Sequence, residues 1–202
     1  MGERRRQDRL SRHSDAGATL AELLIVIVLA STLTAVTVPV TGAALDAEHV
    51  RQAASFVATR VRAARQQAIT GSAGAALVFD RVAGRWVFRV CVDGNANGVR
   101  RAELSGPDHC VGEVQDVETL FPGVRVAIDS TLPGPDGDAP SADPVKFGRS
   151  DMASCSPLGS CTAGTVFLRS ERGLQWAIRV AGVTGRTRLL RYDNGVRAWR
   201  DD

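Results

Sequence analysis

The stretch "GATLAELLIVIVLASTLTAVTVPV", residues 17–40, decides how the rest of the chain is interpreted. It contains one charged residue, Glu22, and the eighteen residues from Leu23 to Val40 carry no charge. Eighteen apolar residues reach the usual lower limit for a helix that spans a bilayer. A carboxylate at the edge of such a segment is costly unless it has a partner or a function. The sequence therefore predicts a transmembrane helix over residues 18–41, with a glutamate that needs an explanation.

The residues before this segment predict its orientation. Arginines precede the apolar run at positions 4, 5, 6, 9 and 12. By the positive-inside rule this end stays in the cytoplasm. We expect a single-pass protein of the bacterial inner membrane, with its globular part in the periplasm.

Three interpretations of the segment compete. A secretory signal peptide cut near "VTGAALDA", residues 40–47, would have an unusually long apolar core and no glutamate at its entrance. A plain membrane anchor would place Glu22 at the level of the lipid headgroups. A cut between Gly17 and Ala18 would make Glu22 the fifth mature residue, about one helical turn from the new amino group.

The third interpretation coincides with a known family. The stretch resembles the class III signal of type IV pilins and type II secretion pseudopilins. Gly17, Thr19, Leu20 and Glu22 match its pattern, and Pro39 falls at the twenty-second mature position, where the family usually has a proline. Ala18 departs from the pattern, because phenylalanine is usual there.

The resemblance implies a role for each of these positions. A prepilin peptidase would cut after Gly17 on the cytoplasmic side and methylate Ala18. In such filaments the glutamate of one subunit is thought to meet the charged N-terminus of a neighbour. A paired carboxylate is tolerable in hydrocarbon, whereas an unpaired one would be protonated or expelled. Glu22 would then select the axial register during assembly with other pilins or pseudopilins.

The helix is expected to continue beyond the membrane to about Thr70. Arginines occupy mostly other faces of this part, and Gly71 and Gly74 end the pattern. Pro39 is expected to bend the helix locally. The apolar residues recur at three- and four-residue spacing: Val50, Ala53, Ala54, Val57, Val61, Ala64 and Ala68.

Short strands follow Gly71. Alternating segments such as "AALVFD" and "GRWVFRVCV" flank the turn "DRVAG", and five further segments of this kind lie between residues 124 and 199. The segment 130–144, "STLPGPDGDAPSADP", is expected to be a mobile surface loop. We predict an α+β, pilin-like fold with a long N-terminal transmembrane helix packed on an antiparallel sheet. Its parts would be a leader (1–17), a membrane helix (18–41), an extramembrane helix (42–70) and a periplasmic domain (71–202).

The four cysteines fit an exported domain. They are Cys91, Cys110, Cys155 and Cys161, and no two of them form a C-x-x-C pair, which disfavours a zinc ribbon. An even number behind an export signal favours two disulfides. Of the three pairings we expect Cys91–Cys110 and Cys155–Cys161, because each closes a short loop with Gly and Pro. Free buried thiols are the alternative.

The region after the helix resembles the GspH/FimT-type minor pseudopilins. The resemblance rests on "GRWVFRVCVDGNANGVRRAE", residues 84–103, and "GVTGRTRLLRY", residues 182–192. It implies a structural subunit of a filament, and it leaves open whether that filament serves secretion or a pilus.

Within the first of these motifs, "DGNANGVRRAEL" has part of a calcium-loop pattern. Asp93, Asn95 and Asn97 have spacing 1, 3, 5, and Gly98 is at position 6. The twelfth position is Leu104, so the usual bidentate carboxylate is missing or one residue early, at Glu103. A tight structural turn explains the same residues. We expect the turn and no cofactor, with calcium as the alternative.

The second motif carries Arg186, Arg188 and Arg191. On a strand, Arg186 and Arg188 would share one face, and such a patch could bind DNA phosphates without sequence preference. In FimT-like minor pilins a G-R-x-R element is associated with DNA capture during transformation. A solvated face or a contact with a neighbouring pilin is the other interpretation.

No motif indicates catalysis. The chain has three histidines and lacks G-x-S-x-G, H-E-x-x-H and P-loop patterns. We therefore expect a minor pseudopilin or minor pilin, with a DNA-binding minor pilin as the runner-up and a membrane-tethered enzyme as the remaining alternative.

Overall fold

The computed structural model describes residues 19–202, apart from the side chains of residues 34–41. The chain divides into two compact units, Met1–Gly42 and Ala43–Asp202. The predicted cleavage site, Gly17 and Ala18, lies outside the described residues. Pro39 lies inside the first helix but its side chain is not described, so the predicted bend stays a prediction.

The first helix, α1, runs from Leu20 to Gly71. Thr19 caps its start, since its Oγ1 accepts a hydrogen bond from the backbone N–H of Glu22 at 3.3 Å. The helix ends where Ser72 adopts a positive φ of 49° and its N–H bonds back to the Ile69 carbonyl at 3.4 Å.

The first sheet has four antiparallel strands in the order β3-β2-β1-β6. The two-residue turn between β1 and β2 has positive φ at Ala83 and Gly84, which is typical of a tight hairpin whose twist matches its strands. The strands are β1 (Ala75–Val82), β2 (Arg85–Val92), β3 (His109–Asp116) and β6 (Met152–Cys155).

The second sheet has six antiparallel strands, five of them in the order β10-β9-β8-β7-β4, and β5 also pairs with β7. The strands are β4 (Val124–Val126), β5 (Val145–Lys146), β7 (Gly164–Ser170), β8 (Gln175–Val180), β9 (Thr187–Asp193) and β10 (Ala198–Asp201). Two short helical turns complete the fold: η1 (Arg101–Glu103) and α2 (Val117–Leu120).

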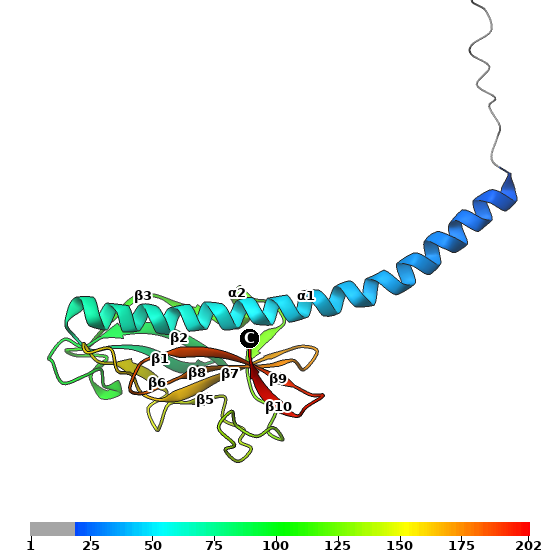
Figure 1. Cartoon of the computed structure of the whole chain (residues 1–202). Helices are drawn as coiled ribbons and strands as arrows, with labels where there is room; N and C mark the ends of the chain where they lie inside the picture. The colour runs from blue at the N-terminus through cyan, green and yellow to red at the C-terminus, as the bar shows by residue number, and fades with distance from the viewer. Residues whose placement is uncertain (1–18) are drawn as a thin grey trace, which may run out of the picture. The chain divides into compact units, whose positions relative to one another are not determined.

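One main core joins these elements. The part of α1 within Ala43–Gly71 lies along the sheets (Figure 1), and its small apolar face packs against both. Every buried apolar residue that the structure describes lies between Val50 and Leu190, so the unit Ala43–Asp202 contains the whole described core. The helix contributes Val50, Ala53, Ala54, Val57, Ala58 and Val61 to this core.

The predicted fold class is confirmed in its coarse form, an α+β protein with antiparallel strands. The strands form two sheets rather than one, and the sequence analysis missed β3, β5 and β6. The segment 130–144, expected to be a mobile surface loop, makes two contacts with distant strands. Trp199 Nε1 donates to the Pro133 carbonyl at 2.8 Å, and Arg179 forms an ion pair with Asp136. Distant residues make these bonds, so the segment's own composition could not reveal them.

Candidate functional site

The start of α1 carries the residue on which the sequence argument rests. Glu22 lies in the first helical turn, and Thr19 precedes it by three residues, as in a capping box. A carboxylate here also faces the positive end of the helix dipole. An acidic residue at position 22 is therefore favourable for the start of the helix itself, in addition to the assembly role that the resemblance implies.

The helix surface that follows Glu22 is apolar and exposed. Within the described part of the chain, no helix offers a stretch with the length and apolarity that a membrane crossing requires. The predicted segment 18–41 includes residues outside the description, so it stays a prediction. The exposed apolar side chains are Leu20, Leu23, Leu24, Ile25, Val26, Ile27, Val28, Leu29 and Leu33.

The predicted basic strand is only partly a strand. Arg188 and Arg191 lie in β9, whereas Arg186 comes directly before it, so the shared strand face expected for Arg186 and Arg188 stays a prediction. Arg188 pairs with Asp201 in two bonds, one of them from Nε to Oδ1 at 2.9 Å. This hydrogen bond lowers the pKa of the Asp201 carboxyl and raises that of Arg188. The charge of Arg188 is therefore already matched.

Two arginines of α1 join this segment, and the sequence analysis did not assign them a contact. Arg62 Nη2 donates to the Thr187 carbonyl at 3.4 Å, and Arg65 Nε donates to the Gly159 carbonyl at 2.8 Å. Gly185 has a φ of +60°, and a Cβ there would lie 2.5 Å from Arg65 Nε. The glycine of the G-R-x-R element thus leaves room for Arg65 and for the Gly159 carbonyl. The helical spacing of Arg62 and Arg65 was visible in sequence, but their partners were not.

The loop between β2 and β3 is organised by two buried carboxylates. Asp93 Oδ1 accepts from the Asn95 N–H at 3.0 Å, and Oδ2 accepts from the Gly98 N–H at 2.7 Å. Burial raises the pKa of Asp93, but the surrounding backbone N–H groups lower it, and the net shift is downward. Asp108, which the sequence analysis missed, is 1% exposed and accepts from the backbone of Arg100 at 2.8 Å.

The remaining residues of the calcium-like pattern bond to each other. The side-chain amides of Asn95 and Asn97 donate to the Glu103 carboxylate, at 2.6 and 3.1 Å to Oε2. Among residues 19–202 no group of three or more His, Cys, Asp or Glu side chains could hold a metal ion. The geometry provides a turn closed by its own hydrogen bonds, and calcium stays an untested alternative.

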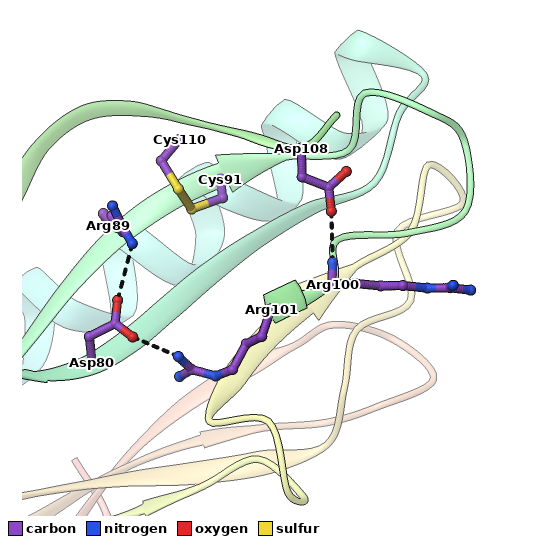
Figure 2. The surroundings of a disulfide bond; sticks show 7 residues. All are labelled: Asp80, Arg89, Cys91, Arg100, Arg101, Asp108 and Cys110. Atoms are coloured by element: carbon purple, nitrogen blue, oxygen red, sulfur yellow. Dashed lines mark hydrogen bonds and ion pairs between the residues drawn. A yellow bond between two sulfur atoms is a disulfide. The ribbon is translucent and has the colours of Figure 1, made fainter. Parts of the chain in front are cut away.

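The predicted disulfide pairing is confirmed. Cys91 is bonded to Cys110 and Cys155 to Cys161, and in each pair the two residues face each other across antiparallel backbone. Figure 2 shows the first disulfide and, near it, two ion pairs that also hold this loop. In these, Asp80 bridges Arg89 and Arg101. These covalent and ionic ties fix the 93–108 loop to the first sheet.

Comparisons with known proteins identify no relative of this chain. No protein-family model, no curated protein and no solved structure matches the chain. The functional argument therefore rests on the residues themselves.

Proposed function

We propose that this chain is a minor pseudopilin or minor pilin, a structural subunit of a periplasmic filament or its tip. It would be made as a precursor, inserted in the inner membrane and cut after Gly17 by a prepilin peptidase. The observation that carries the proposal is the spacing of Gly17, Glu22 and Pro39 around the start of one long helix. Among the filament functions, we favour support of type II protein secretion.

Two structural features support this proposal. The described apolar residues between Leu20 and Leu33 lie on all sides of the helix and are exposed, so they need an apolar environment outside this chain. The same helix then packs one small-residue face on antiparallel sheets, with two disulfides that suit an exported domain. A membrane before assembly, or the helices of neighbouring subunits afterwards, would cover the exposed part.

The mature N-terminus tests this function. Intact-mass analysis of the protein from membrane fractions should give a chain that begins at Ala18, with the added mass of one methyl group. Gly17→Ala should leave the precursor uncut, whereas Gly2→Ala, in the leader, should not affect the cut. A mature chain that begins near Ala43 would indicate a secretory signal peptide and exclude the proposal.

A second candidate is a minor pilin that binds DNA. It is favoured by Arg186 and Arg191, which are exposed and form no ion pair with any described residue. Phosphate contacts carry no sequence information, so binding should be independent of sequence and fall steeply with salt. It is disfavoured by Asp201, which already neutralises Arg188.

Fluorescence anisotropy with the unit Ala43–Asp202 separates the two candidates. If DNA is the ligand, Arg186→Gln with Arg188→Gln should lower affinity and flatten the salt slope. For a filament subunit without this role, low-salt binding should be small and indifferent to the double substitution. We expect this second result, because Arg188 is paired.

A further inference from the structure

The end of the domain at the last turn of α1 carries an unusual apolar surface. Leu158 is 96% exposed and Val183 is 90% exposed, the two highest values among the large apolar side chains that the structure describes. Ile69, in the last turn of α1, is also exposed. We name these three residues the apolar tip. Scattered exposed apolar residues are normal, but a cluster drawn from three separate segments indicates an interaction surface.

The two turns that carry Leu158 and Val183 touch each other. The Cys161 N–H donates to the Gly182 carbonyl at 2.7 Å. A Cβ on Gly185 would lie 2.6 Å from the Gly159 carbonyl oxygen, so these backbones are in contact. A Cβ on Gly159 would lie 3.3 Å from Ile69 Cδ1, which places Ile69 beside the same turn. The three segments that carry the apolar tip therefore lie side by side at this end of the domain.

Both turns are fixed in shape. In the first, the Ser156 N–H donates to the Ser160 carbonyl at 2.8 Å, and the Cys155–Cys161 disulfide closes its base. In the second, the Gly185 N–H donates to the Ala181 carbonyl at 2.8 Å. Leu158 and Val183 are thus held in water by ordered backbone and do not have to be ordered on binding, which favours association.

Three arginines lie on or beside the segments that carry the apolar tip, and we name them the arginine rim. Arg62 and Arg65 precede Ile69 by seven and four residues, so all three share one helix face. Arg186 follows the second turn directly. Arg62 and Arg65 donate to backbone carbonyls, and none of the three forms an ion pair with a described residue. Arg186 lies near Asp201, but that carboxylate is bonded to Arg188.

We propose that the apolar tip and the arginine rim bind the surface of an anionic phospholipid bilayer. Leu158 and Val183 would enter the boundary between headgroups and acyl chains, while the guanidinium groups of the rim contact lipid phosphates. Projecting aliphatic side chains beside cations without carboxylate partners fit this soft, negatively charged surface. DNA would use the rim but leave the apolar tip in water. The inference goes beyond the proposed function and does not require α1 to cross a membrane.

Vesicle sedimentation of the unit Ala43–Asp202 tests the inference, since this unit contains the whole described core. The protein should sediment with vesicles of phosphatidylcholine mixed with phosphatidylglycerol, and much less with phosphatidylcholine alone. Leu158→Asn with Val183→Thr should weaken lipid binding about tenfold, because both side chains then lose apolar contact. The matched control, Leu120→Asn with Val114→Thr, changes exposed apolar residues elsewhere and should bind normally. Arg62→Gln with Arg186→Gln should remove the preference for anionic lipid.

Three results would overturn the inference. One is the absence of sedimentation with either vesicle. A second is binding that survives the change of Leu158 and Val183, which would mean electrostatic adsorption alone. A third is lipid-independent self-association by light scattering that the same change abolishes, because a second copy would then cover the apolar tip. Circular dichroism melts of each variant show that the fold is retained.

Discussion

The two parts of α1 both carry apolar side chains, but these differ in exposure. Large apolar side chains from Leu20 to Leu33 are between 54% and 78% exposed, whereas Val50, Val57 and Val61 are fully buried. In the first part apolar residues surround the helix, and in the second they form one face of alanines and valines. Apolarity alone therefore does not indicate what a helix packs on. A helix with one apolar face is expected to pack on its own chain. A helix that is apolar on every side is expected to be covered by a membrane or by another chain.

The largest expected effect comes from a charge placed on the buried face of the second part. Val57→Asp should destabilise the full chain in detergent by more than about 4 kcal/mol, because it buries an unpaired carboxylate. Ile27→Asp, the matched control, should leave unfolding unchanged, since Ile27 is exposed. Tryptophan fluorescence in urea reports this, because all three tryptophans lie within residues 86–199. An equal loss of unfolding free energy in both variants would contradict the difference in packing between the two parts of α1.

The disulfides should stabilise the unit on which the second part packs. Their loops span 19 and 6 residues. Loop-closure entropy then predicts a loss of about 3 kcal/mol for Cys91→Ser with Cys110→Ser, and about 2 kcal/mol for Cys155→Ser with Cys161→Ser. Urea unfolding of Ala43–Asp202 measures both. A larger loss for the Cys155 and Cys161 pair would show that the longer loop is already restrained in the unfolded chain without its disulfide.

The contact between Arg65 and Gly185 also distinguishes the packed part of α1 from the exposed part, because it joins the packed part to a turn distant in the sequence. Gly185→Ala should cost about 2 to 3 kcal/mol, from a positive φ and from clashes with Arg65 and the Gly159 carbonyl. Arg65→Ala should make the same glycine change less costly. Gly84→Ala is the control, since its φ is +82° and its Cβ would meet nothing within 4 Å. Equal costs at both glycines would mean that the clashes at Gly185 do not contribute, and an unchanged cost in Arg65→Ala would assign the clash to the Gly159 carbonyl alone.

Asp93 gives a smaller, pH-dependent effect. Its pKa in the folded state lies below the ordinary value of 3.8, so its charge stabilises the fold above that pH. This stabilisation is lost as the pH falls through the folded-state pKa. Asp93→Asn should thus lower the melting temperature near neutral pH, and the difference from wild type should shrink in acid. Calcium should leave both melting temperatures unchanged, because backbone N–H groups already occupy the carboxylate; a calcium-dependent rise for wild type alone would contradict this.

Glu22 should have the smallest effect on stability and the clearest effect on assembly. Glu22→Ala should leave the unfolding of Ala43–Asp202 in the full chain unchanged and weaken crosslinking to other pilins in the membrane. Thr19→Ala removes the cap but keeps the charge, and it should preserve crosslinking. Equal losses in the two variants would mean that Glu22 acts by starting the helix, as the Thr19 contact allows.

Local patterns in the sequence determined much of this protein. The periodicity of Val50, Val57 and Val61 identified the packed helix, and alternation identified β1, β2 and every strand of the second sheet except β5. The cysteine pairs were predictable because each closes a short loop. Helical and strand periodicity depend on neighbouring residues, so a single chain displays them directly.

Only the tertiary structure decided the rest. Strand β3 contains Gly112 and Glu113 and is exposed along most of its length, so it lacks alternation and depends on pairing with β2. Arg62 meets Thr187 across 125 positions of the chain. The apolar tip likewise unites one helix end with two turns. Such contacts follow from how the elements pack, and no local propensity of these residues encodes their partners.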